Sequence, residues 1–204
     1  MTTYAFFNFP AYGHVNPTLA IVQELIARGE KVVYYLPERF RQTIEATGAI
    51  FRATSADPFS QAQERSLVVD PADGDKRLAM LPALLVQKSA QVVPQLLESV
   101  RAERADCLVY DGMFLWGKLV AQILHIPAIA LRPTYVANQQ SNVFVPQRLS
   151  FPPDMLALLN ATLGELCHTY SLSPLDVHSA FKSTELLNIV FLPRAFQPAG
   201  DTFD

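Results

Sequence analysis

The sequence has few cysteines, few glycines and no cluster of positive charge, and each shortage excludes a class of protein. With 2 cysteines in 204 residues, neither a disulfide framework nor a cysteine-rich metal site is expected, so Cys107 and Cys167 are predicted to be buried thiols. A net charge of −3 with scattered lysines and arginines indicates no nucleic-acid partner. The first apolar run is too short for a signal-peptide core, and no run reaches the roughly 18 residues of a membrane span. We therefore expect a cytoplasmic protein without an integral membrane segment.

What is abundant is apolar sequence, which makes up 50% of the chain and allows one sizeable core. Short apolar runs typical of buried strands alternate with stretches of helical periodicity. Strands are expected over 4–9, 31–36, 49–53, 106–110, 128–131 and 186–191. Helices are expected over 17–28, 38–47, 76–104, 114–124, 153–170 and 176–182. Such alternation predicts an α/β fold, a Rossmann-like open parallel sheet with helices on both faces.

The rest of the chain is organised around residues 4–29. Asn16 is a good helix N-cap and Pro17 suits the first helical position, so the first helix is predicted to begin there. Gly29 is predicted to end it in the left-handed conformation. His14 would then lie on a short loop between the first strand and this helix, where open α/β sheets place their chemistry.

Two parts of the sequence leave their structure open. Residues 54–75 have weak periodicity and form a long connection, which we expect to be a mobile flap. Within 76–104, Pro82 and Pro94 either bend one long helix or divide it into two. Residues 132–151 are also irregular.

His14 and Asp111 form the one pair of residues that suggests catalysis. In a doubly wound sheet the first and fourth strands are neighbours, so a histidine after the first and an aspartate ending the fourth would meet at one edge. A carboxylate that accepts a proton from one imidazole nitrogen would orient the histidine as a general base. The structural alternatives are that the histidine only starts a helix and that the aspartate only caps the next helix. From spacing alone, the two interpretations are about equally supported.

The remaining candidates for chemistry are weaker. His125 is expected in a turn and His168 and His178 in helices, all with structural roles. Gly13 is the only glycine of the first loop, so neither a dinucleotide fingerprint nor a P-loop is present, and a nicotinamide or flavin dehydrogenase is disfavoured.

At these residues the sequence resembles a known family. FPAYGHVNPTLAIVQELIARGEKVVYY (9–35), DCLVYDGMFLWGKLVAQILHIPAIALRPTYVAN (106–138) and the closing FLPRAFQPAGDTFD (191–204) are similar to the N-terminal, acceptor-binding half of bacterial macrolide-type UDP-glycosyltransferases, family 1 enzymes with the GT-B fold. The resemblance implies that His14 deprotonates the acceptor hydroxyl and that Asp111 orients it. The implied reaction is inverting transfer of a hexose from a nucleotide sugar, without a metal.

The same resemblance implies that this half holds the acceptor, a hydrophobic hydroxylated small molecule such as a macrolide or a phenol. By position, the acceptor-binding side chains around the strand ends would be Phe9, Met113, Phe114, Thr134 and Tyr135. The flap after Thr54 and a loop through Phe144 would close over this pocket. For each aromatic among them, core packing is at least as good an interpretation.

The sequence departs from the family in lacking its donor domain. Residues 1–192 are expected to form the acceptor-binding domain and 193–204 the start of an interdomain linker. The nucleotide sugar, here a co-substrate and the only cofactor-like molecule expected, would be bound mainly by the missing half. The chain could thus be a truncation, an excised domain or one subunit of a split enzyme that needs a donor-domain chain. Alone, the chain is expected to be inactive and to self-associate through its exposed face. The alternative function is a small-molecule binding module.

Overall fold

The structure is a computed structural model, and it describes residues 1–55, 57, 71–136, 151–182 and 185–203, with the backbone alone over 71–79. Six parallel strands form one sheet in the order β3-β2-β1-β4-β5-β6. The strands are β1 (Thr3–Phe7), β2 (Lys31–Leu36), β3 (Ile50–Ala53), β4 (Cys107–Asp111), β5 (Ala128–Arg132) and β6 (Leu187–Val190). The predicted α/β class and the predicted neighbourhood of the first and fourth strands are confirmed.

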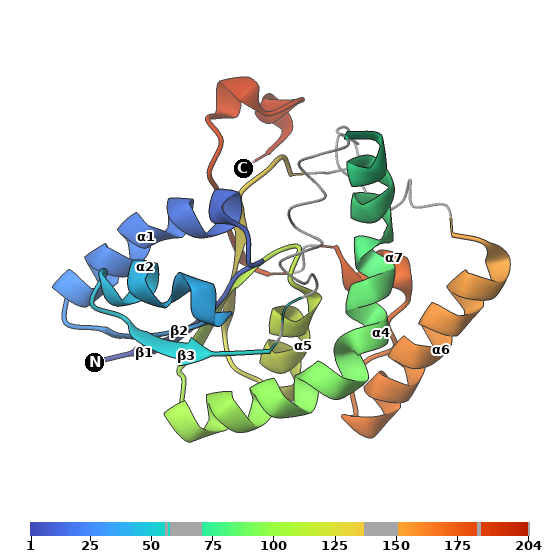
Figure 1. The fold of residues 1–204 in the computed structure, drawn as a ribbon, viewed down its shortest axis with the longest axis horizontal. Coiled ribbons are helices and arrows are strands. Elements are labelled where there is room, and N and C mark those ends of the chain that lie inside the picture. Colours follow the sequence, from blue (N-terminus) through green and yellow to red (C-terminus); the bar gives the residue numbers. More distant parts are fainter. Residues whose placement is uncertain (56, 58–70, 137–150, 183–184, 204) are drawn as a thin grey trace.

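Helices cover both faces of the sheet, as Figure 1 shows. One face packs against α1 (Tyr12–Ala27), the short 3₁₀ turn Glu38–Phe40 and α2 (Arg41–Glu45), and the other against α4 (Pro71–Glu103) and α5 (Leu115–Leu124). On that side α6 (Pro153–Thr169) packs on α4, and α7 (Val177–Ala180) packs on α6. Strands buried on both faces need near-continuous apolar runs, which is why KVVYYL and CLVYD form β2 and β4. This buried sheet is the rigid support of the site described below.

The first helix begins earlier than the sequence predicts. Its N-cap is Ala11 rather than Asn16, and Pro17 lies inside the helix. The missing N–H of Pro17 would have bonded the carbonyl of Gly13, which is exposed, so water can solvate that carbonyl. The prediction of a loop histidine was therefore wrong, because His14 lies in the first turn of α1. Gly29, at φ +81°, follows the helix end in the left-handed conformation as predicted.

The two prolines of α4 bend it without dividing it. The helix is continuous over Pro71–Glu103 with Pro82 and Pro94 inside, and Figure 1 shows it bent. Of the long connection predicted to be a flap, most residues lie outside the described part of the chain, as does most of the irregular stretch after Arg132.

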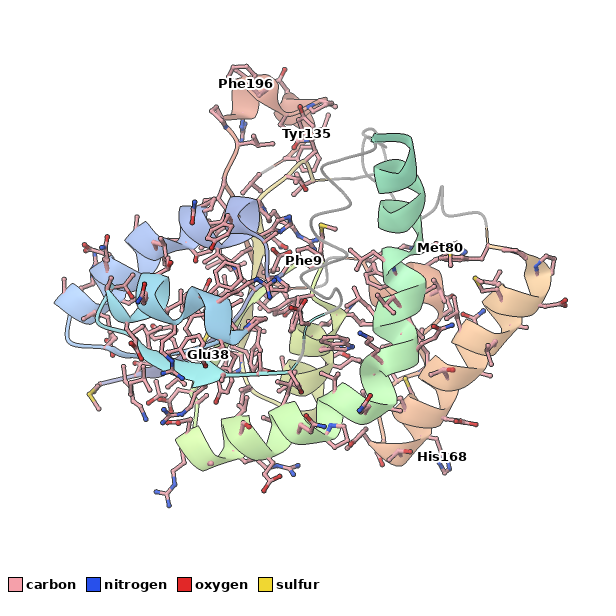
Figure 2. All side chains as sticks on the ribbon, in the orientation of Figure 1. Phe9, Glu38, Met80, Tyr135, His168 and Phe196 are labelled. Atoms are coloured by element: carbon pink, nitrogen blue, oxygen red, sulfur yellow. The ribbon has the colours of Figure 1, made fainter. Side chains whose placement is uncertain are left out.

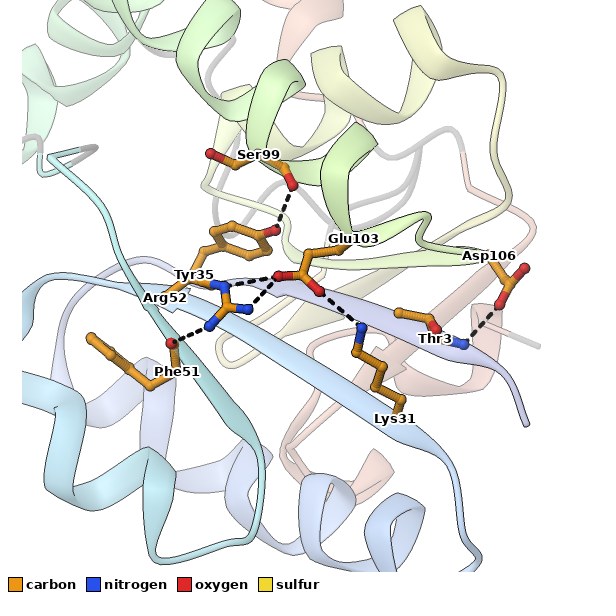
Figure 3. Close-up of polar contacts among 8 residues, drawn as sticks. All are labelled: Thr3, Lys31, Tyr35, Phe51, Arg52, Ser99, Glu103 and Asp106. Carbon is orange, nitrogen blue, oxygen red and sulfur yellow. Dashed lines mark hydrogen bonds and ion pairs between the residues drawn. The ribbon is translucent and has the colours of Figure 1, made fainter.

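The C-terminal end of α4 is tied to the sheet by charge, as Figure 3 shows. Glu103 accepts a hydrogen bond from Lys31 Nζ at 2.9 Å and pairs with the Arg52 guanidinium at 2.6 Å. The Tyr35 hydroxyl donates to the carbonyl of Ser99 at 3.2 Å. These contacts join α4 to β2 and β3, which lie far from it in the sequence.

Residues beyond β6 form two 3₁₀ turns, Arg194–Phe196 and Gly200–Thr202. Gln197 attaches this segment to the end of β5 by accepting from the N–H of Val136 at 3.0 Å and donating to its carbonyl at 2.9 Å. Cys107 and Cys167 are free thiols. Among the described helices, none combines the length and the apolar character needed to cross a bilayer.

Candidate active site

The sheet brings His14 and Asp111 together at the carboxyl ends of β1 and β4. His14 is the third residue of α1, and Asp111 is the last residue of β4. Their Nδ1 and Oδ2 atoms are 2.5 Å apart. The Asp111 side chain is 1% exposed and that of His14 is 16% exposed. The carboxylate is therefore sequestered behind an imidazole that solvent reaches.

Both oxygens of Asp111 are engaged. Oδ2 faces His14, and Oδ1 accepts from the backbone N–H of Met113 at 2.8 Å. A buried carboxylate without such donors would be costly, so these two contacts keep it in place in its charged, accepting form. Nδ1 of His14 must then carry the hydrogen in the neutral imidazole, which leaves Nε2 with a free lone pair. In the part of the chain that the structure describes, Nε2 has no hydrogen-bond partner.

The residues around His14 fix its position. The Asn8 amide nitrogen donates to the backbone carbonyl of His14 at 2.9 Å, and the Phe9 ring lies with its centroid 5.1 Å from that of the imidazole. The Arg39 guanidinium donates to the carbonyl of Pro10 at 2.7 Å, which holds the turn that leads into α1. Asn8 was not singled out in the sequence, although a polar residue directly after an apolar strand run marks the sheet edge.

The residues expected to bind the acceptor occupy different environments. Phe9 is next to the histidine, and Met113, half-buried, is next to Asp111 through its own N–H. Thr134 is half-buried, whereas Tyr135 is exposed and lies near the C-terminal segment in Figure 2. Phe144 lies outside the described residues.

Phe114 is the exception in this set. Its side chain is 1% exposed and packs on Phe7 and edge-on against Trp116. This position fits the core-packing alternative kept open for the aromatics, because a side chain surrounded by the core has no surface to offer a ligand. In the structure Phe114 is therefore part of the core beside the site and does not line it.

The other histidines lie away from this pair. His125 follows α5 at φ 53°, His168 is in the last turn of α6, and His178 is in α7 with its Nδ1 buried and unpartnered among the described residues. The described residues contain no group of three histidine, cysteine, aspartate or glutamate side chains placed to hold a metal ion.

Comparison with known proteins places the chain among glycosyltransferases. No protein-family model matches it. It is 33% identical to the NDP-glycosyltransferase YjiC of Bacillus licheniformis over 98% of the chain and 48% of that protein, and 33% identical to the demethyllactenocin mycarosyltransferase of Streptomyces fradiae over 100% of the chain and 45% of that protein. The chain thus spans about half the length of the curated relatives it matches.

Solved structures of glycosyltransferases share its fold. The crystal structure of CalG4, the calicheamicin glycosyltransferase, superposes with a TM-score of 0.77 and 27% identity, over all of this chain and 51% of that one. Sequence and fold agree along the whole chain, and the half-length match fits an N-terminal half. Along its whole length the chain is therefore similar to about one half of bacterial glycosyltransferases of the UDP-glycosyltransferase type, and it has the fold of one half of the GT-B structures.

Proposed function

We propose that this chain is the acceptor-binding half of an inverting, UDP-sugar-dependent glycosyltransferase, with His14 as the general base and Asp111 as the residue that orients it. The observation that carries the proposal is the 2.5 Å contact between His14 Nδ1 and a buried carboxylate at the sheet edge. An ionised Asp111 fixes the hydrogen on Nδ1 and so presents the lone pair of Nε2 outward. That lone pair can take the proton of an acceptor hydroxyl.

In the proposed reaction, Nε2 takes the proton of an acceptor hydroxyl while the acceptor oxygen forms a bond to the anomeric carbon of the sugar. The bond between that carbon and the nucleotide diphosphate breaks, and the diphosphate leaves with the electron pair. Attack from the opposite side inverts the anomeric centre. The imidazolium that forms is stabilised by the Asp111 carboxylate beside it. Proton transfer of this kind contributes roughly 10² to 10⁴ in rate, and no metal takes part in the proposed step.

The acceptor would be a hydrophobic hydroxylated natural product, as the names of the macrolide and calicheamicin relatives suggest. Phe9, Met113, Thr134 and Tyr135 are proposed to line its site. The nucleotide sugar would be held mainly by a donor half, on the same polypeptide or on another, and the chain by itself would be inactive. A cytoplasmic location is part of this proposal, since nucleotide sugars are made there.

The test is a chimera in which this chain replaces the corresponding half of the Bacillus licheniformis relative. Supplied with a UDP-sugar and a phenolic acceptor, the His14→Ala variant should lose roughly 10² to 10⁴ in kcat. His125→Ala is the matched control, because His125 lies beyond the far end of α5, and it should leave turnover unchanged. Full activity of His14→Ala would defeat the assignment of the base.

A small-molecule binding module is the competing function, and calorimetry on the chain alone separates the two. A module should bind an aglycone whether or not His14 is present, and no donor half should convert the complex into product. Product formation that depends on His14 contradicts the module.

A further inference from the structure

A second charged side chain lies at the same sheet edge as the candidate base. Arg132 is the last residue of β5, which pairs with β4 so that Leu131 faces Asp111. Its guanidinium lies directly over Gly112, where a β-carbon added at residue 112 would be 2.0 Å from Arg132 Nη1 and 2.2 Å from Cζ. The guanidinium therefore occupies the space of a side chain at 112, one residue after the carboxylate that holds His14.

Arg132 is half-buried, yet the described residues provide no hydrogen-bond partner for its guanidinium. Its Nε is fully buried and unpartnered. The nearby acids are already engaged, since Glu185 accepts from the Tyr110 hydroxyl at 2.7 Å and Asp111 accepts from His14 and Met113.

Lys118, a buried cation among the described residues, shows what a satisfied site looks like. Lys118, 3% exposed, donates to the carbonyls of Ser179, Ala180 and Lys182 at 2.9 to 3.2 Å. Its ammonium caps the end of α7 and needs nothing further. Arg132 lies on the same side of the sheet without any such acceptor, so burial alone does not explain its lack of partners.

A buried cation without a partner is costly, because its lost hydration is not replaced. Burial lowers the pKa of Arg132, and the nearby Tyr110, Asp111 and Glu185 offset only part of this effect, but a guanidinium stays protonated in proteins. Its planar fork of donors matches the two oxygens of a carboxylate or phosphate better than any other side chain does. An oxyanion that enters from solvent would replace the hydration that folding removes.

We infer that Arg132, whose guanidinium Gly112 allows to lie at this edge of the sheet, forms an oxyanion-binding subsite near Asp111, which takes a carboxylate or phosphate group of a substrate. The inference rests on the proposed function in one respect, namely that the oxyanion belongs to the acceptor or to the sugar nucleotide. A carboxylated acceptor and the diphosphate of the donor share the required chemistry, and the experiment distinguishes them.

The test measures binding to the chain itself by NMR titration. One pair of probes is 4-hydroxycinnamate and its neutral amide, and the other is UDP and uridine. The subsite should favour the anion of at least one pair by about ten- to a hundred-fold, and Arg132→Gln should bring the two members of that pair to within about twofold. Preference for the cinnamate assigns the subsite to the acceptor, and preference for UDP assigns it to the donor. The matched control is Arg28→Gln, whose side chain is exposed and paired with Glu24.

An outcome in which neither anion is preferred, or in which Arg132→Gln keeps the preference, overturns the inference. Arg132→Gln could unfold the chain, so a second variant is measured by thermal unfolding, without any ligand. Arg132→Met keeps an unbranched apolar stem and removes the charged guanidinium, so its melting temperature should be at or above that of the wild type. A large drop would mean that Arg132 has a structural partner and no vacant subsite. Failure of His14 as a base would leave both binding results unchanged, so the two proposals can fail separately.

Discussion

At the scale of single residues, the site depends on one carboxylate whose two oxygens have different tasks. Oδ1 of Asp111 is bound to the Met113 N–H, and that contact fixes the carboxylate in the turn after β4. Oδ2 is left to face Nδ1 of His14. Removal of the charge should therefore change the proton position on the imidazole without moving either side chain.

Asp111→Asn tests this division. The amide is uncharged and can donate to Nδ1, which would turn the hydrogen to Nε2 and remove the lone pair that faces the acceptor. In the chimera with a donor half, we expect kcat to fall by about 10²-fold or more, with the KM for the acceptor little changed. Turnover within threefold of the wild type would show that the aspartate does not orient the base.

Glu103 gives a prediction about stability and pH. The hydrogen bond from Lys31 has the largest effect and lowers the pKa of Glu103 in the folded chain; burial, second in size, raises it, and the hydrogen bond from Arg52 adds to the lowering (Figure 3). Its stabilising effect is thus present above the unfolded-state pKa of about 4.3 and is lost as the pH falls through the lower folded-state value. Glu103→Gln should reduce the free energy of unfolding by about 1 to 2 kcal/mol at pH 7, and the difference should disappear well below pH 4.

Urea unfolding at several pH values measures the effect of Glu103. Glu24→Gln is the control, because its i,i+4 pair with Arg28 is exposed and should matter little. A difference in unfolding free energy between wild type and Glu103→Gln that stays constant down to low pH would contradict the predicted pH dependence.

At the scale of elements, the position of α5 depends on its close approach to β4. A β-carbon at Gly117 would lie 2.6 Å from Cβ of Tyr110 and 3.5 Å from Cβ of Phe7. The helix is thus in contact with the sheet through the one residue type that fits. Because β4 ends in Asp111 and α5 begins at Leu115, this contact also sets the turn between them, which carries the site carboxylate.

Gly117→Ala should push α5 away from the sheet and cost about 1 to 3 kcal/mol in unfolding free energy. Gly164→Ala is the matched control, since that glycine lies within α6 with nothing within 4 Å, and it should stabilise by about 0.5 to 1 kcal/mol through the unfolded chain and helix propensity. If Gly117→Ala were as stable as the wild type, the close approach would not constrain α5.

The start of α1 shows where sequence reasoning reaches its limit at this scale. The strands were predictable because burial on both faces leaves continuous apolar runs, and strand order followed from the alternation with helices. Asn16 and Pro17 are strong local signals for a helix start, yet the helix begins at Tyr12. The competing influence is a tertiary one, the contact of His14 with Asp111 and with the Asn8 amide, 97 and 6 residues away in the sequence.

Side-chain roles were harder to predict than elements. The His14–Asp111 contact could be predicted because His14 follows β1 and Asp111 ends β4, at the same edge of the sheet. Phe114 could not be assigned, since an aromatic after a strand can line a pocket or fill the core, and only its packing on Phe7 and Trp116 decides. Arg132 directly follows the apolar run 128–131, the same arrangement that marks Asp111, so the sequence also indicates a charge at this sheet edge.

At the scale of the whole molecule, two exposed aromatic side chains lie where the residues after β5 meet the C-terminal segment that follows β6. Tyr135 is 41% and Phe196 is 70% exposed, and Gln197 joins their two segments through two hydrogen bonds to Val136. Figure 2 shows both side chains at the same end of the molecule. Exposed apolar groups that are held together mark an interaction surface.

We predict that this surface causes the isolated chain to self-associate at high concentration. Phe196→Ser together with Tyr135→Ser should shift sedimentation profiles toward monomer, because the apolar area that associates is removed. Leu158→Ser, at an exposed position of α6, is the control and should have no such effect. A wild-type chain that remains a clean monomer would contradict the prediction.

The central claim is that His14 removes the proton of the acceptor hydroxyl, and acceptor acidity tests it most directly. In the chimera, kcat/KM is measured for the wild type and His14→Ala with a series of phenols of increasing acidity, ending with nitrophenols that are already ionised. If His14 is the base, the loss caused by His14→Ala should be roughly 10² to 10⁴ for weakly acidic phenols and should shrink toward none as the hydroxyl ionises by itself. A loss of the same size for every acceptor would contradict the account.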